Sequence, residues 1–253
     1  MGLLEVRDCT IRFGGLTAVK SLSMSLEKGA LYGLIGPNGA GKTTVFNLLT
    51  GVYHPNEGSI ELDGKSLNKL KPSRIARLGM SRTFQNIRLF QSMTVLENVK
   101  LARHGARKQN VWDATLHNRK QRDEEAQIEH DAMELLEIFN LEGRADELAI
   151  NLPYGSQRRL EIARALATGP RVLLLDEPAA GMNPQESLDL MHLIRRVRDR
   201  FDLTVLLVEH NMRVVMGVCE RIQVIDYGET IALGSPREIQ DNPKVIEAYL
   251  GGA

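Results

Sequence analysis

Hydrophobic and polar positions alternate along the first part of the chain, as they do in strands with one buried face. The apolar residues of 4–13 follow this spacing with a slip near Cys9 that indicates a bulge, and alternation resumes over 21–26. The run at 31–35 is apolar throughout, which is typical of a short buried strand. We therefore expect β structure up to residue 35.

The spacing of apolar residues becomes helical in the middle of the chain. Charged residues dominate 93–140, and within this stretch Ala132, Leu135, Leu136 and Phe139 recur at positions that share one helix face. The segment therefore predicts a mostly helical lobe.

Continuous apolar runs return after this lobe. Residues 172–175 form one such run, which ends in Asp176, and 203–208 form a second. Unbroken runs of this length are typical of parallel strands buried on both faces. Two further stretches, 222–225 and 230–233, flank a short polar turn and predict a hairpin.

The residues from Ser235 to Glu238 predict the start of a helix. Serine stands at the cap position, proline follows at the first helical position, and glutamate lies three residues after the cap. This is the pattern of a capping box.

Composition limits the classes of function. Hydrophobic residues make up 43% and charged residues 25%, as in ordinary globular proteins. Lys+Arg and Asp+Glu are both 32, so no net field favours nucleic acid or an anionic membrane. The only cysteines, Cys9 and Cys219, lack metal-ligand spacing and suit a reducing cytosol. The charged N-terminal residues do not resemble a signal peptide, and no apolar run approaches the ~20 residues that cross a bilayer.

A phosphate-binding pattern lies between the 31–35 strand and a helix predicted at 44–50. Its residues are Gly36, Pro37, Asn38, Gly39, Ala40, Gly41, Lys42, Thr43 and Thr44, which fit G-x-x-x-x-G-K-[ST]. The glycines let backbone N–H groups turn toward an anion, and the positive end of the helix dipole lies at the same point. We expect Lys42 to reach the β- and γ-phosphates and Thr43 to ligate Mg²⁺. The alternative is a glycine-rich turn that only joins the strand to the helix.

Two adjacent carboxylates follow the 172–175 strand. Asp176 stands where P-loop NTPases place a Mg²⁺-directed aspartate, and Glu177 is placed to orient and deprotonate an attacking water. Alone, the pair also fits a helix cap followed by an acid in the first turn. The P-loop upstream favours the catalytic interpretation.

With further motifs in order, the chain resembles the nucleotide-binding subunits of ABC transporters over nearly its whole length. The other motifs are a glutamine loop at 81–86, a signature at 152–157, a D-loop at 180–183 and a switch histidine, His210. Each motif alone is weak, whereas the ordered set around a full P-loop is specific.

The resemblance implies an α/β fold with a P-loop NTPase core. Its sheet is expected to be mixed and mainly parallel with flanking helices, and an antiparallel β subdomain and an inserted helical subdomain complete it. Within a single domain of 1–253, the core is expected at 1–92 and 158–253 and the helical lobe at 93–157.

The resemblance also assigns roles at the nucleotide site. ATP and Mg²⁺ are the implied ligands, and Phe13 falls where the family stacks an aromatic ring on adenine. Glu177, His210 and Gln85 are the implied catalytic residues: the base, the γ-phosphate contact and the group that touches Mg²⁺ and the attacking water. The implied metal ligands are Thr43, Gln85 and Asp176.

The implied mechanism needs two chains arranged head to tail. The signature of one chain, at Tyr154, Gly155, Ser156 and Gln157, would close over the nucleotide of the other through the N-terminus of a helix predicted at 157–168. Pro153 stands where the family has serine, which deletes a hydroxyl and a backbone donor, and Tyr154 replaces a glycine. We therefore expect slower hydrolysis at the site that this signature completes. In the D-loop, Asn183 stands where an aspartate is common.

Some stretches are similar to the ATPases of branched-chain amino-acid importers. They are 13–15, 82–85, 89–90, 93–95, 97–98, 154–155, 158–164, 176–181 and 242–251. That subfamily implies two transmembrane permease subunits, an identical or sister ATPase, indirect contact with an extracytoplasmic solute-binding protein, and no nucleic acid. It also implies a peripheral position on the cytoplasmic face of the inner or plasma membrane. The alternatives are a urea or amide importer, a lipopolysaccharide exporter, or a soluble ABC ATPase acting on nucleic acid.

Overall fold

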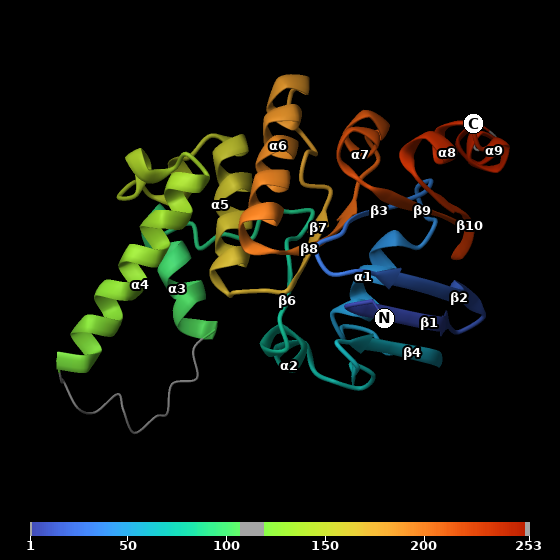
Figure 1. Cartoon of the computed structure of the whole chain (residues 1–253), viewed down its shortest axis with the longest axis horizontal. Coiled ribbons are helices and arrows are strands. Elements are labelled where there is room, and N and C mark those ends of the chain that lie inside the picture. The colour runs from blue at the N-terminus through green and yellow to red at the C-terminus, as the bar shows by residue number, and fades with distance from the viewer. Residues whose placement is uncertain (1, 107–118, 251–253) are drawn as a thin grey trace. The chain divides into compact units, whose positions relative to one another are not determined.

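The computed structural model describes residues 2–106 and 119–250, and its elements are labelled in Figure 1. The chain divides into two compact units. The first comprises residues 1–85 and 171–253, and the second comprises residues 86–170. The bounds expected for the helical lobe were 93 and 157. The second bound differs from 170 because the whole of one helix, Tyr154–Ala167, packs within the second unit.

A six-stranded sheet forms the centre of the first unit. Its strands are β3 (Leu31–Ile35), β6 (Met80–Arg82), β7 (Val172–Asp176), β8 (Thr204–Val208), β9 (Arg221–Asp226) and β10 (Glu229–Gly234). They lie in the order β10-β9-β3-β8-β7-β6, and every pair is parallel except the β9–β10 hairpin. Every residue of β3, β7 and β8 is buried, which confirms the reading of their apolar runs as central strands.

An antiparallel sheet of four strands completes the β structure of this unit. It contains β1 (Leu4–Phe13), β2 (Leu16–Leu26), β4 (Glu57–Leu62) and β5 (Lys65–Ser66), in the order β2-β1-β4-β5. The predicted slip near Cys9 is confirmed, because the β1–β2 register shifts between Val6 and Cys9. Inward-facing residues of this sheet and the apolar face of the first helix form one hydrophobic core with strands of the central sheet.

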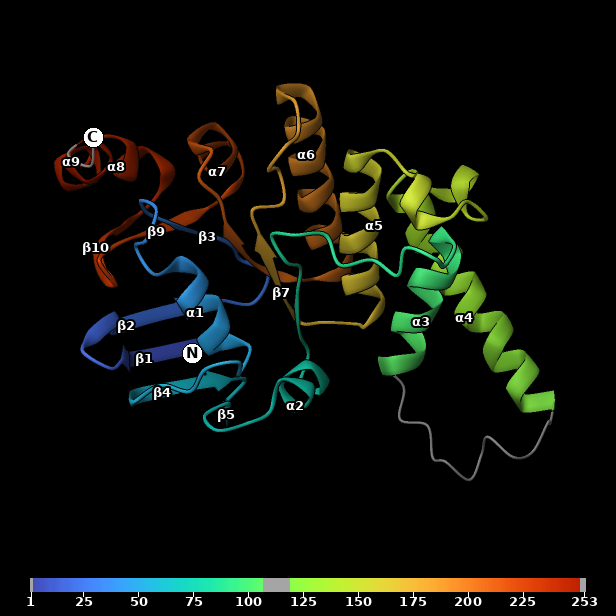
Figure 2. The same ribbon diagram turned by 180° about the vertical axis from the view of Figure 1, so that it is seen from behind.

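The helices of the first unit are α1 (Lys42–Leu49), α2 (Pro72–Arg77), α6 (Pro184–Phe201), α7 (Met212–Val218), α8 (Pro236–Gln240) and α9 (Pro243–Leu250). Ser235 caps α8 and Glu238 bonds back to the Ser235 N–H, so the predicted capping box is confirmed. Seen from either side, α8 and α9 lie next to the β9–β10 hairpin (Figures 1 and 2).

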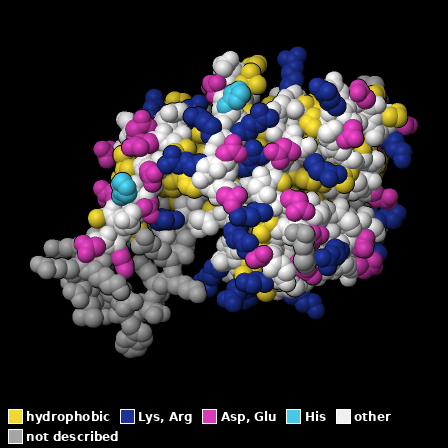
Figure 3. All heavy atoms as spheres, viewed as in Figure 1, with side chains coloured by type: hydrophobic (Ala, Val, Ile, Leu, Met, Phe, Trp, Pro, Cys, Tyr) yellow, Lys and Arg dark blue, Asp and Glu magenta, His cyan; other side chains and the backbone are white. Residues whose placement is uncertain are grey.

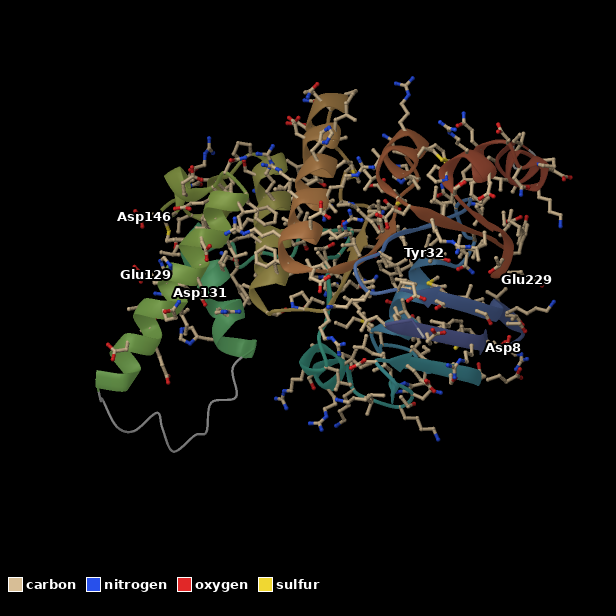
Figure 4. All side chains as sticks on the ribbon, in the orientation of Figure 1. Asp8, Tyr32, Glu129, Asp131, Asp146 and Glu229 are labelled. Carbon is tan, nitrogen blue, oxygen red and sulfur yellow. The ribbon has the colours of Figure 1, made fainter. Side chains whose placement is uncertain are left out.

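The second unit is helical. It contains α3 (Val95–Ala106), α4 (Arg119–Ile138), α5 (Tyr154–Ala167) and two short 3₁₀ turns, Glu142–Arg144 and Ala149–Asn151. Ala132, Leu136 and Phe139, predicted to share one face, are at most 1% exposed. Asp131 of α4, labelled in Figure 4, pairs with Arg103 of α3 at 2.7 Å.

Among the described residues, no helix combines the length and the apolar character needed to cross a bilayer. Both cysteines are buried and unpaired. Burial raises the pKa of the Cys9 thiol to about 11 and that of Cys219 to about 12.

Candidate nucleotide site

The P-loop joins the buried end of β3 to the first turn of α1. Gly39 and Gly41 have φ values of 82° and 104°, which favour glycine. At Gly36 the constraint is space: a Cβ there would lie 2.0 Å from the Ile225 carbonyl oxygen. The backbone of the P-loop therefore depends on glycine at both ends.

Lys42 is folded back over the loop. Its ammonium donates hydrogen bonds to the carbonyl oxygens of Gly36 at 2.7 Å and Pro37 at 2.8 Å, and the residue is only 8% exposed. Burial lowers the pKa of Lys42, and the carboxylates of Glu177 and Asp176 act in the opposite direction. The lysine therefore lies within the electrostatic reach of both predicted carboxylates.

The remaining P-loop residues differ in their exposure to solvent. Asn38, Gly39 and Thr43 are exposed, Pro37, Gly41 and Thr44 are half-buried, and Ala40 is buried. A groove of about 950 Å³ runs along residues 36–40, and His210 also lines it. The predicted phosphate cradle is thus open at the surface of the first unit.

Asp176 ends β7 and is held by an arginine that the sequence did not single out. Arg82 donates to Asp176 Oδ2 at 2.7 Å and to Asn47 Oδ1 at 2.7 Å, and both charged side chains are 7% exposed. The guanidinium also lies over the rings of Phe46 and Phe84, at 5.2 and 5.1 Å from their centroids. Parallel pairing of β6 with β7 brings Arg82 to this position.

The three residues expected to be catalytic converge on one carboxylate oxygen. Gln85 Nε2 donates to Glu177 Oε2 at 3.0 Å, and His210 Nδ1 lies 3.5 Å from the same oxygen. Glu177 has φ 48°, a strained conformation for a residue with a side chain, and its N–H donates to the Val208 carbonyl oxygen at 2.8 Å. The backbone thus turns sharply here to present the carboxylate.

A second carboxylate, Glu209, supports this arrangement from within. It is 1% exposed and accepts a hydrogen bond from the Ala179 N–H at 2.8 Å. Burial raises its pKa, and the bond from Ala179 partly offsets this. Glu209 therefore links the strand end that carries His210 to the segment that follows Glu177. Sequence reasoning gave it no role, since nothing in the local pattern shows where its side chain points.

Phe13 lies at the end of β1 and is 43% exposed. Its ring meets Tyr53 edge to face, with centroids 5.0 Å apart. The accessible ring is compatible with the adenine contact that the resemblance implied. The contact between Phe13 and Tyr53 was not predicted, because the two residues are 40 positions apart in sequence.

The D-loop ends in a helix cap. Asn183 accepts from the Glu186 N–H, and Glu186 bonds back to the Asn183 N–H, so α6 begins with a complete capping box. The amide side chain is thus used within the chain, as an aspartate at this position would be.

The signature residues form the first turn of α5 in the second unit. The helix begins at Tyr154, three residues before the predicted start at 157, with Pro153 as its cap residue and no side-chain bond at the cap. Proline is tolerated there because the first turn leaves its N–H groups unpaired anyway. Tyr154 is 45% exposed and its hydroxyl accepts from Arg158 at 3.3 Å, while Gln157 Nε2 donates to the Leu152 carbonyl oxygen at 2.9 Å.

Positive and negative side chains are interspersed over the described part of the face shown in Figure 3. This distribution agrees with the formal net charge of 0. The charges that act at the nucleotide site are therefore those of nearby side chains, such as the Arg82–Asp176 pair.

Comparison with known proteins agrees with these features. A family model described as ABC transporter matches residues 19–180, and one described as Branched-chain amino acid ATP-binding cassette transporter matches residues 229–253. The high-affinity branched-chain amino acid transport ATP-binding protein BraF of Pseudomonas aeruginosa is 48% identical over 99% of this chain and 98% of its own length. LivG of Escherichia coli, which carries the same description, is 47% identical with the same coverage.

Solved structures resemble the chain throughout its length. An ATP-binding cassette of an ABC transporter in its ADP conformation has a TM-score of 0.86 and 30% identity, covering 99% of both chains. A dimeric cassette bound to ADP and Pi in a post-hydrolysis state has a TM-score of 0.77 and 25% identity, covering 92% of this chain and 99% of the other. The predicted fold class is confirmed, and the chain belongs to the family of ATP-binding cassette subunits of ABC transporters.

Proposed function

We propose that this chain is the ATP-hydrolysing subunit of an importer for branched-chain amino acids, with its catalytic centre at Glu177. The observation that carries the catalytic assignment is the convergence of Gln85 and His210 on Glu177 Oε2, at 3.0 and 3.5 Å. The names of the relatives at 47–48% identity support the transport assignment and favour it over urea, amide or lipopolysaccharide transport.

In this proposal the P-loop holds the phosphates of ATP through its N–H groups and Lys42. Lys42 leaves the Gly36 and Pro37 carbonyl oxygens and turns to the β- and γ-phosphates. Phe13, with Tyr53 at its edge, stacks on the adenine. Glu177 accepts the proton of the attacking water, while Gln85 and His210 hold the carboxylate and the water in place.

The residues proposed to hold Mg²⁺ are Thr43, Gln85 and Asp176. Their donors are a hydroxyl, an amide oxygen and a carboxylate, which suit a hard cation that keeps part of its water shell. Arg82 holds the Asp176 carboxylate in place through its hydrogen bond. Asp176 therefore suits the role of a metal ligand, because a ligand that is already held in position loses little freedom on binding. When bound, the ion would neutralise charge on the transferring phosphoryl group.

Closure of the site requires a second chain. The first turn of α5 has Tyr154 exposed and Gly155, Ser156 and Gln157 half-buried. Its N–H groups would meet the γ-phosphate held by another copy or a sister ATPase. Hydrolysis removes that anion and weakens the clamp, which converts the ATPase cycle into opening and closing. The dimeric relative bound to ADP and Pi supports a two-chain arrangement.

Two transmembrane permeases are the proposed partners, with an extracytoplasmic solute-binding protein acting through them. The chain would then sit on the cytoplasmic face of the membrane, held there by the permeases. The described residues contain no helix able to cross a bilayer.

The transport assignment is tested by isolating the tagged chain from mildly solubilised native membranes and identifying bound proteins by mass spectrometry. We expect two permeases, an ATPase and an amino-acid-binding protein, all absent from an untagged control. Loss of uptake of labelled leucine on deletion, with uptake of urea unchanged, would complete the assignment. Recovery of only nucleic-acid-bound partners would reject it.

A further inference from the structure

The C-terminal part of the chain packs against the P-loop although it contains none of the motif residues. The groove beside residues 36–40 is walled on its other side by Lys244 and residues 247–249 of α9. This helix belongs to the segment that the branched-chain family model matches, 229–253. Figures 1 and 2 show α9 next to the hairpin that leads into it.

The β9–β10 turn holds the far end of the P-loop. The Gly228 N–H donates to the Ala40 carbonyl oxygen at 2.9 Å, and the Gly228 carbonyl oxygen accepts from the Lys20 N–H at 2.9 Å. The turn is thus bonded to the loop on one side and to β2 on the other.

The near end of the P-loop lies between β9 and α9. Gly36 is pressed against the Ile225 carbonyl oxygen, where only a residue without Cβ fits. Burial raises the pKa of the Tyr249 phenol on α9, and the Gly36 N–H, which faces its oxygen, acts in the opposite direction. That hydroxyl is buried, and none of the described residues makes a hydrogen bond of normal geometry with it.

A buried hydroxyl without a partner is unfavourable, so a small approach of Gly36 toward Tyr249 would be favoured as soon as the loop is free to make it. In this structure the carbonyl oxygen of the same residue accepts a hydrogen bond from Lys42 Nζ at 2.7 Å. Once Lys42 turns to a phosphate, its bond to the Gly36 carbonyl oxygen is lost, and Gly36 can shift toward Tyr249.

We propose that Tyr249 is a positioning residue of the nucleotide site, whose hydroxyl accepts a hydrogen bond from the Gly36 N–H when ATP occupies the P-loop. The C-terminal segment then braces the loop at both ends, through Tyr249 at Gly36 and through Gly228 at Ala40. This inference rests on the proposed function, because it takes ATP as the occupant of the loop.

The test compares the wild-type chain with Tyr249→Phe, which keeps the ring and removes only the hydroxyl. Tyr227→Phe is the matched control, because Tyr227 borders the same groove but is 86% exposed. We expect Tyr249→Phe to raise the Kd and KM for ATP about fivefold, the worth of one neutral hydrogen bond, with kcat unchanged. With ATP bound, amide hydrogen exchange of residues 31–41 should be faster than in the wild type.

A Lys42→Ala variant distinguishes failure of the proposed phosphate site from failure of the role of Tyr249 alone. It should lose ATP binding; if it binds ATP normally, the proposed phosphate site is wrong and the role of Tyr249 falls with it. If Lys42→Ala loses binding while Tyr249→Phe has the wild-type Kd and exchange rates, only the role of Tyr249 is overturned. A lowered melting temperature of Tyr249→Phe without a change in Kd would also overturn it, because the hydroxyl would then serve stability alone.

Discussion

The nucleotide site of the first unit and the signature turn of the second unit are built in opposite ways. The carboxylates of Asp176 and Glu177 have partners from a distant part of the chain, Arg82 and Gln85 respectively. At the start of α5, Pro153 caps the helix without any side-chain bond, and Tyr154 is 45% exposed. The first region is held by side-chain bonds within one chain, whereas the second begins its helix without a side-chain cap. In the proposed mechanism the second region of one chain closes the first region of another.

The largest effect is expected from Glu177→Gln. The substitution keeps the shape of the side chain but removes its ability to accept a proton, so kcat for ATP hydrolysis should fall by about 10²-fold or more. ATP affinity should remain near the wild-type value, and the variant should elute as a dimer on size-exclusion chromatography with ATP. Glu142→Gln, an exposed carboxylate in the second unit, is the control. Hydrolysis by Glu177→Gln at the wild-type rate would show that another group is the base.

The next largest effect is expected from breaking the buried ion pair between Arg82 and Asp176. Arg82→Met leaves the Asp176 carboxylate buried without its partner, and we expect the free energy of unfolding to fall by about 3 kcal/mol. Urea unfolding measures this change. Arg12→Met, which breaks an exposed pair with Glu57, should cost less than about 1 kcal/mol. Equal losses in the two variants would mean that burial of the Arg82 pair adds nothing.

Glu209 predicts how the stability of the first unit depends on pH. Its folded-state pKa is raised by burial above 4.5, the value of an unperturbed glutamate, so the folded chain binds this proton more tightly than the unfolded chain. The contribution of Glu209 to stability is therefore greatest below pH 4.5 and declines as pH rises toward the folded-state pKa. Glu209→Gln should flatten this part of the curve of urea midpoint against pH. A curve identical to that of the wild type would contradict the assigned shift.

The smallest effect is expected at the signature turn. Pro153→Ser restores a hydroxyl and a backbone donor at the cap of α5, so turnover at saturating ATP should rise a few-fold while the KM for ATP changes little. Ser156→Thr, which keeps a hydroxyl in the same turn, serves as the control. An unchanged rate would show that the N–H groups and dipole of the helix suffice for closure.

Sequence reasoning predicted what is encoded locally. The strand at 31–35, the hairpin after 222 and the capping box at Ser235 depend on neighbours a few residues away, and all are present. Roles assigned through the ordered motifs stay proposals where the geometry alone does not decide them, as for Phe13 and adenine.

The missed features are those that depend on contacts between distant residues. Arg82 and Asp176 are 94 positions apart and meet only because β6 pairs with β7. The bond from Ala179 to Glu209 spans 30 positions and depends on where the chain turns after Glu177. The start of α5 was misplaced because proline at its cap position does not look like a helix signal, although it is compatible with one.

The two buried cysteines make the chain a ready starting point for crosslinking. A thiol with a pKa of about 11 or 12 is almost wholly protonated at neutral pH and so reacts poorly with disulfides or maleimides. One cysteine introduced at Asn38 and another at Ser156 would then be the reactive pair, without removal of the native ones. Oxidation of that variant would join two chains covalently if the signature of one meets the P-loop of the other, which makes the arrangement visible on a non-reducing gel.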